Sequence, residues 1–88
     1  MLFRSEVLDT LARIYIKRKD YPKAVEALRQ AISRATNPVP LQFALAQVHA
    51  SSGDNASAVA ELQSIVDRGK SNPMFPQARR MLADLRKR

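Results

Sequence analysis

Apolar residues recur along this 88-residue chain at the spacing of amphipathic helices, in five separate segments. The pattern i, i+3, i+4, i+7 predicts a first helix over about residues 4–18, a second over about 22–34, and a fifth that runs to the C-terminus. The expected core positions are Leu8, Leu11, Ala12 and Tyr15; Ala24, Leu28, Ala31 and Ile32; Leu41, Leu45, Val48 and His49; Ala58, Leu62, Ile65 and Val66; and Ala78, Met81, Leu82 and Leu85. We therefore expect an all-α fold of five helices.

Capping and helix-breaking residues stand between these segments. Asp20 and Asp54 suit the N-cap position, because their carboxylates can accept unpaired backbone N–H groups, and Pro22 suits a first turn. Gly53 and Gly69 follow the third and fourth segments, where a left-handed residue commonly ends a helix. The linkers within each pair are two to four residues long, so consecutive helices should be antiparallel neighbours.

The sequence repeats with a period of 34 residues. The stretch KRKDYPKAVEAL at 17–28 returns as SSGDNASAVAEL at 51–62 (51 − 17 = 34), and identical residues recur at Ala24 and Ala58 and at Leu28 and Leu62. A helix pair repeated at this period resembles the tetratricopeptide repeat family, whose pattern is W-x2-L-G-x2-Y, then A-x3-F, then A and P.

The resemblance can be followed position by position. The matching residues are Leu8, Leu11, Ala12, Tyr15, Ala24, Leu28 and Ala31 in the first repeat, and Gln42, Leu45, Ala46, His49, Ala58, Leu62 and Ile65 in the second. Gln42 and Ile65 depart from the family pattern, and the closing prolines, Pro38 and Pro73, come late. The resemblance implies a right-handed solenoid of antiparallel helix pairs, with repeats at about 5–38 and 39–72 and a capping helix at about 73–88.

The two ends of the chain carry further expectations. The tail RGKSNPMFPQARRMLADL is similar to the C-terminal end of bacterial tetratricopeptide proteins of envelope export, including the PEP-CTERM and exopolysaccharide systems. This implies a periplasmic or outer-membrane lipoprotein parent, with the cytoplasm as the alternative. Leu2 and Phe3 are apolar and precede the first helix, so we interpret them as residues that would contact a preceding helix. We therefore expect a fragment of a longer repeat protein that self-associates through an uncapped N-terminal side.

The formal charge of +7 is concentrated at the two ends of the chain. Residues 1–38 hold eight basic and four acidic side chains, residues 39–67 hold none and three, and residues 68–88 hold seven and one. The clusters KRK at 17–19 and RKR at 86–88 leave nucleic acid or an acidic polysaccharide as the alternative partner. Helix C-termini favour cations in any protein, however, and no aromatic stacking platform lies between these residues.

Catalytic, metal and cofactor chemistry finds little support in the sequence. Cysteine is absent, and His49, the single histidine, stands where the first repeat has Tyr15, which favours a packing role. Glu6 and Asp9 share a helix face, as a pair of carboxylates for acid–base catalysis would. Arg13 lies at i+4 from Asp9, however, which instead predicts an exposed ion pair. No run approaches the roughly 18 apolar residues of a membrane span. We expect no enzyme, no cofactor and no membrane span.

The family resemblance also implies a groove, lined by the first helix of each pair, that binds a peptide or partner helix. The groove positions are Glu6, Asp9, Arg13 and Lys17; Phe43, Gln47 and Ser51; and Arg79, Ala83 and Arg86. Chaperone-binding members place lysine and asparagine where this chain has Asp9 and Ala44, so chaperone-tail binding is not expected. Phe43 either contributes to the groove or packs on a neighbouring helix. The expected function is a noncatalytic protein-interaction scaffold, within a bacterial secretion or export assembly.

Overall fold

The computed structural model of the chain describes residues 5–87, except for the side chains of Ser5, Glu6 and Asp9. Within that range the chain forms five helices and no strand: α1 (Ser5–Lys17), α2 (Tyr21–Arg34), α3 (Val39–Ser51), α4 (Asn55–Asp67) and α5 (Phe75–Arg86). The expected all-α fold is confirmed, and the bounds predicted for the first two helices are correct to within one residue at each end. Leu2 and Phe3, on which the expected N-terminal contact depends, lie outside the described residues.

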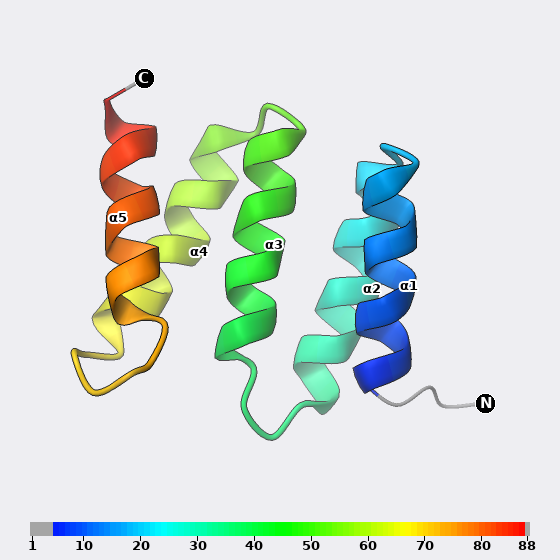
Figure 1. Cartoon of the computed structure of the whole chain (residues 1–88), viewed down its shortest axis with the longest axis horizontal. Coiled ribbons are helices and arrows are strands. Elements are labelled where there is room, and N and C mark those ends of the chain that lie inside the picture. The colour runs from blue at the N-terminus through cyan, green and yellow to red at the C-terminus, as the bar shows by residue number, and fades with distance from the viewer. Residues whose placement is uncertain (1–4, 88) are drawn as a thin grey trace.

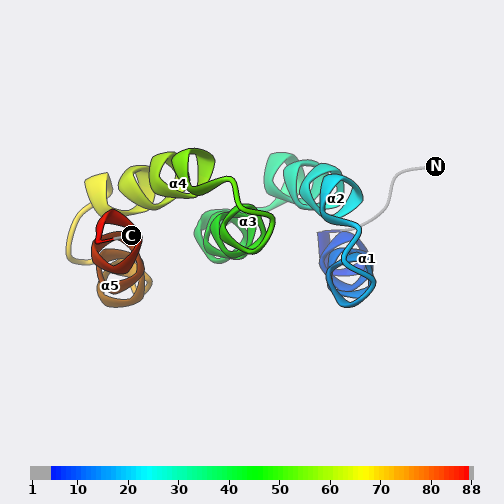
Figure 2. The ribbon, with the colours of Figure 1, turned by 90° about the horizontal axis from the view of Figure 1, so that it is seen from above.

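The helices form a row in two layers. Helices α2 and α4 lie behind α1, α3 and α5, and each helix packs most extensively against its neighbours in sequence (Figures 1 and 2). In Figure 2, α3 is set back between α1 and α5, so the layer of these three helices curves inward. None of the described helices is both long and apolar enough to cross a membrane.

The core consists of two clusters, each built from one helix pair and the helix that follows it. The first contains Ala12, Ala24, Ala27 and Leu28 with Leu45 and Val48 of α3. The second contains Val39, Ala46, Ala58, Leu62 and Ile65 with Ala78, Leu82 and Leu85 of α5. The alanines at the crossings within each pair, Ala12 with Ala24 and Ala46 with Ala58, are at most 1% exposed, and their small side chains let the helices approach closely. Each cluster therefore joins a pair to its successor.

The two expected N-caps differ in the structure. The carboxylate of Asp54 accepts the backbone N–H of Ser57 at 3.1 Å and caps α4 as predicted. Asp20 occupies the N-cap position of α2, but the prediction that its carboxylate caps the helix is wrong. Pro22 is the second residue of α2 and has no N–H to donate, and the Asp20 carboxylate instead lies 3.6 Å from the ammonium of Lys23.

The turns that end α1 and α3 have the same backbone geometry. The N–H of Asp20 donates to the carbonyl of Tyr15 at 2.9 Å, and 34 residues later the N–H of Asp54 donates to the carbonyl of His49 at 2.8 Å. Such turns require one left-handed residue, which is Gly53 (φ +90°) in the second and Lys19 (φ +60°) in the first. The predicted left-handed geometry of Gly53 is confirmed, whereas that of Lys19 was not expected.

Candidate partner-binding groove

Helix α3 is the centre of the inward-curving face and carries no Asp, Glu, Lys or Arg among its residues. Its buried side includes Leu45, Ala46 and Val48, which contact the two core clusters. Its other side is also largely apolar, and its exposed polar side chains are Gln47 and Ser51. A helix that is apolar on nearly all sides normally lies between other elements.

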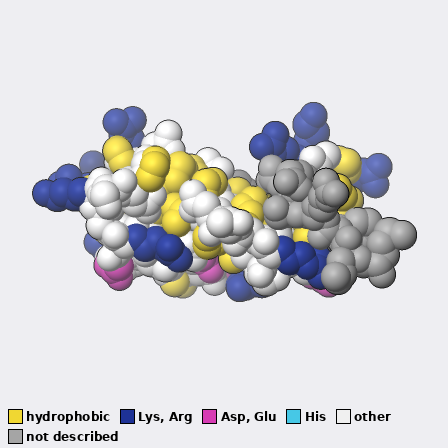
Figure 3. Space-filling model, turned by 90° about the horizontal axis from the view of Figure 1, so that it is seen from below, with side chains coloured by type: hydrophobic (Ala, Val, Ile, Leu, Met, Phe, Trp, Pro, Cys, Tyr) yellow, Lys and Arg dark blue, Asp and Glu magenta, His cyan; other side chains and the backbone are white. Residues whose placement is uncertain are grey.

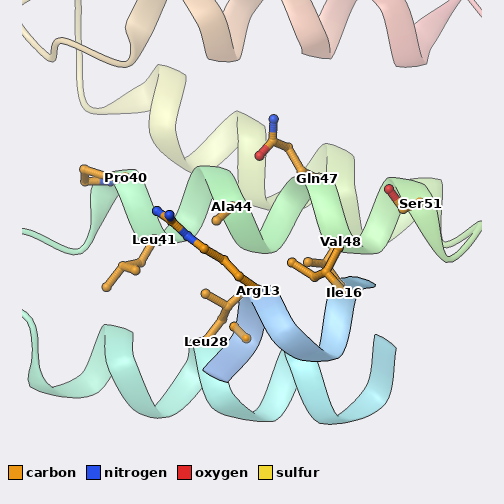
Figure 4. Close-up of a pocket in the computed structure, with 10 residues that line it drawn as sticks. Arg13, Ile16, Leu28, Pro40, Leu41, Ala44, Gln47, Val48 and Ser51 are labelled. Carbon is orange, nitrogen blue, oxygen red and sulfur yellow. The ribbon is translucent and has the colours of Figure 1, made fainter. Parts of the chain in front are cut away.

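A hollow of about 310 Å³ lies between α1 and α3 on this face. Its lining residues are Ala12, Arg13 and Ile16 of α1, Leu28 of α2, and Pro40, Leu41, Ala44, Gln47, Val48 and Ser51 of α3. In Figure 4 the side chain of Arg13 extends from α1 across the hollow toward α3. The hollow therefore combines an apolar floor with a polar rim formed by Arg13, Gln47 and Ser51, and we refer to it as the α1–α3 hollow.

The structure brings three of the predicted groove residues together in this hollow: Arg13, Gln47 and Ser51. Lys17 is exposed at the end of α1. Phe43 is half-buried and packs against the second core cluster, which agrees with the packing interpretation of this residue. The side chains of Glu6 and Asp9, and with them the expected Asp9–Arg13 ion pair, lie outside the described residues.

The predicted groove residues of α5 lie elsewhere. Arg79, Ala83 and Arg86 line a second hollow of about 300 Å³ between α4 and α5, and Nη2 of Arg86 donates to Oε1 of Gln63 at 2.8 Å. Pro40 and Pro76 occupy the same place near the start of α3 and α5, but they are 36 residues apart (76 − 40) and not 34. The difference arises because the linker before α5 is longer than the others. The structure therefore does not bring Arg79 and Arg86 into the α1–α3 hollow.

His49 is a packing residue in this arrangement. Its side chain is 9% exposed, with Nδ1 4.0 Å from Oδ2 of Asp54, and its Nε2 has no hydrogen-bond partner among the described residues. In the first repeat the same position is held by Tyr15, whose ring lies 5.9 Å from the ammonium of Lys23. The described part of the chain contains no cluster of three or more residues suited to hold a metal ion.

Positive charge borders the face without covering its centre. Lys17 is the last residue of α1 and is followed by Arg18 and Lys19, and Arg86 is the last residue of α5 and is followed by Lys87. The C-terminal ends of both helices lie on the upper edge in Figure 1. Figure 3, which views the opposite edge, shows hydrophobic surface between groups of Lys and Arg toward the two ends of the row. An apolar centre flanked by cations suits a ligand that has both apolar and acidic groups.

Two antiparallel helix pairs followed by a further helix, with a hollow between two leading helices, define a helical-repeat scaffold. The sequence profile described as "Tetratricopeptide repeat" matches this chain over residues 10–73 and again over 43–88. The chain therefore belongs to the tetratricopeptide repeat family, as its sequence pattern indicated. Proteins of this family generally mediate protein–protein interactions and are generally noncatalytic. No curated protein and no solved structure matches the chain.

Proposed function

We propose that this protein is a noncatalytic scaffold that binds a peptide or a partner helix along the face formed by α1, α3 and α5. The observation that carries the proposal is the α1–α3 hollow, because an apolar hollow with a few polar groups at its rim is the usual form of a binding site. The absence of charge on α3 supports it further, since a partner can cover this helix without burying an ion.

The chemistry of the hollow indicates what its ligand presents. Ile16, Leu41 and Ala44 offer contacts to one inserted leucine or phenylalanine side chain, and the guanidinium of Arg13 adds positive charge at the rim of the hollow. Lys17, at the end of the same helix, extends the positive potential along the wall. The proposed ligand is therefore an acidic segment with an apolar anchor.

A titration followed by NMR tests this proposal. The protein is mixed with synthetic acidic peptides that each carry one leucine or phenylalanine, and amide shifts are mapped onto the helices. We expect shifts centred on Ile16, Leu41 and Ala44, and we expect Ala44→Trp, which fills the hollow, to weaken binding about tenfold or more. The matched control is Ala60→Trp on the exposed side of α4, which should bind as the wild type does. Shifts that avoid α1 and α3 would contradict the proposal.

Binding of nucleic acid or an acidic polysaccharide is the second candidate, and the basic ends of α1 and α5 on one edge favour it. This candidate predicts binding that weakens steeply with salt, because each neutralised phosphate releases counterions. A gel-shift titration at low and raised salt separates the two functions. Charge reversal at Arg18 and Lys87, which are exposed and do not line the hollow, should abolish polyanion binding and leave the peptide-induced shifts around Ala44 in place.

The resemblance of the C-terminal tail supports a place for this scaffold within a bacterial secretion or export assembly. That proposal concerns the partner and not the binding mode, so it needs a separate test. Site-specific crosslinking in bacterial cells from a photoreactive residue at Gln47 should capture an envelope-export component, and a cytoplasmic partner would contradict the assignment.

A further inference from the structure

Two sets of residues 34 positions apart have the same apolar pattern and very different environments. Leu41, Leu45 and Val48 of α3 correspond to Val7, Leu11 and Ile14 of α1 (41 − 7, 45 − 11 and 48 − 14 all equal 34). Leu45 and Val48 are 1% and 2% exposed, because they pack with Leu28 of the preceding helix. Val7 and Ile14 are 48% and 44% exposed.

Helix α1 thus presents the face that α3 uses to contact a helix before it. We call Val7, Leu11 and Ile14 the α1 stripe. Beside it, Leu11 and Tyr15 line a hollow of about 280 Å³ together with Lys23, Glu26 and Gln30 of α2. Helices α1 and α2 form one end of the row, so this surface faces away from the rest of the described helices (Figures 1 and 2).

The border of the stripe indicates its occupant. Lys23 and Glu26 are both exposed, lie one turn apart on α2 and have opposite charges, and the ammonium of Lys23 also lies 3.6 Å from the Asp20 carboxylate of its own copy. A surface with an apolar centre and one charge of each sign can match a second copy of itself across a two-fold axis, which sets each charge against its opposite. A two-fold axis close to Leu11 and Ile14 would set Leu11 of one copy against Ile14 of the other, and would bring Lys23 of each copy near Glu26 of the other.

The other end of the row does not offer an equal partner. The apolar side of α4, which corresponds to the side of α2 that covers α3, is already covered by α5. The hollow at that end is bordered by the cations Arg79 and Arg86. If the α5 end of one copy packed on the α1 end of another, no exposed helix face would be available to play the part of α2 in the α2–α3 contact. The remaining arrangement joins the α1 ends of two copies.

From these observations we propose that a second copy of this chain covers the α1 stripe, forming a two-fold dimer in which the two α1 helices pack side by side. The residues that α1 gives to the α1–α3 hollow are Ala12, Arg13 and Ile16, and none of them belongs to the stripe. The dimer therefore leaves the proposed ligand site open on each copy, and the two proposals can fail separately.

Sedimentation equilibrium from micromolar to millimolar concentration tests the dimer. We expect the mass to rise from 9.9 kDa and to level off at twice that value. Ile14→Lys should weaken association about tenfold or more, whereas Ala60→Lys, which adds the same charge on the exposed side of α4, should not. Circular dichroism checks that both variants keep the helical fold. A monomer at every concentration, a mass that grows past the dimer, or an Ile14→Lys variant that associates normally would overturn the proposal.

Charge exchange gives a second test, specific to the two-fold arrangement. Lys23→Glu alone and Glu26→Lys alone each place like charges against each other and should weaken association. An equimolar mixture of the two variants should restore association. In a mixed dimer, positions 23 and 26 are both acidic in one copy and both basic in the other, so opposite charges meet again. If the mixture associates no better than either variant alone, the two-fold geometry is wrong.

Discussion

The backbone of Lys19 has a φ of +60°, and the backbone of Gly53, 34 residues later (53 − 19), has a φ of +90°. The two residues occupy the same place in equivalent turns, after α1 and after α3. Glycine adopts this geometry without strain, whereas the β-carbon of lysine crowds the adjacent carbonyl oxygen. The first turn is therefore the more strained of the two.

Replacing Lys19 by glycine should stabilise the protein. Relief of the left-handed strain outweighs the added freedom of the unfolded chain, so we expect a gain of about 0.5–1 kcal/mol. The converse change, Gly53→Ala, should cost about 1 kcal/mol through the backbone alone, because its β-carbon would meet no atom within 4 Å. Urea unfolding measures both changes, and a Lys19→Gly variant less stable than the wild type would contradict the geometry.

Enlarging either alanine at a helix crossing should destabilise the fold. Ala24 and Ala58 are both 0% exposed, so a leucine there forces the paired helices apart, at a cost of about 1–3 kcal/mol. Ala60→Leu, on the exposed side of α4, is the matched control and should change the stability by less than about 0.5 kcal/mol. Thermal melts that do not separate Ala58→Leu from this control would count against close packing at the crossing.

Removing the two N-cap carboxylates should have unequal effects. Asp54→Ala loses the hydrogen bond from the Ser57 N–H and should lower the melting temperature. Asp20→Ala loses an exposed ion pair with Lys23, which contributes little, so its melting temperature should stay closer to that of the wild type. Equal losses in the two variants would mean that Asp20 caps α2 in solution.

Asp54 should also make the stability depend on pH in the acid range. Hydrogen bonds from the side chain and backbone of Ser57 hold the pKa of the Asp54 carboxyl below its ordinary value. A lowered pKa in the folded state means that Asp54 stabilises the fold above its unfolded pKa, and that this contribution disappears as the pH falls through the folded value. Between about pH 6 and about pH 3, Asp54→Asn should therefore lose less stability than the wild type, which denaturant unfolding at a series of pH values measures.

Gln42 offers a stabilising substitution in the second repeat. It stands where the first repeat has Leu8, and its Oε1 is buried with no hydrogen-bond partner among the described residues. An unpaired buried acceptor costs about 1–3 kcal/mol, so Gln42→Leu should raise the free energy of unfolding by about 1 kcal/mol. Gln47→Leu, on the exposed side of the same helix, should not produce this gain, and denaturant unfolding distinguishes the two.

Most of the fold could be predicted because its determinants are local. Apolar spacing and residues such as Pro22 and Gly53 act within one or two turns, and the 34-residue period then arranges the helices in pairs. The left-handed Lys19 could have been found by aligning it with Gly53. The absence of a cap bond at Asp20 could have been found too, because Pro22 removes one of the two N–H groups that such a cap uses.

The site was predictable only in part. Arg13, Gln47 and Ser51 follow from the repeat register, and they do line one hollow. The place of Arg79 and Arg86 depends on how α5 packs against α4 after a longer linker, and a spacing rule cannot specify that. Val48 is buried and Ile14 is exposed, although both are apolar residues at matching positions of the repeat. This difference in exposure likewise depends on which helix lies next to each residue.

The extensive packing in this protein joins helices that follow one another along the chain. Folding therefore closes only short loops, and it should be fast and able to begin in either pair. For the same reason the outer helices can open while the middle of the row stays folded, which amide hydrogen exchange would reveal as protection that declines toward both ends. A ligand that lies across α1, α3 and α5, as proposed, would contact helices that are distant in sequence. Its binding would therefore make the helices, which are otherwise only loosely coupled, unfold as one cooperative unit.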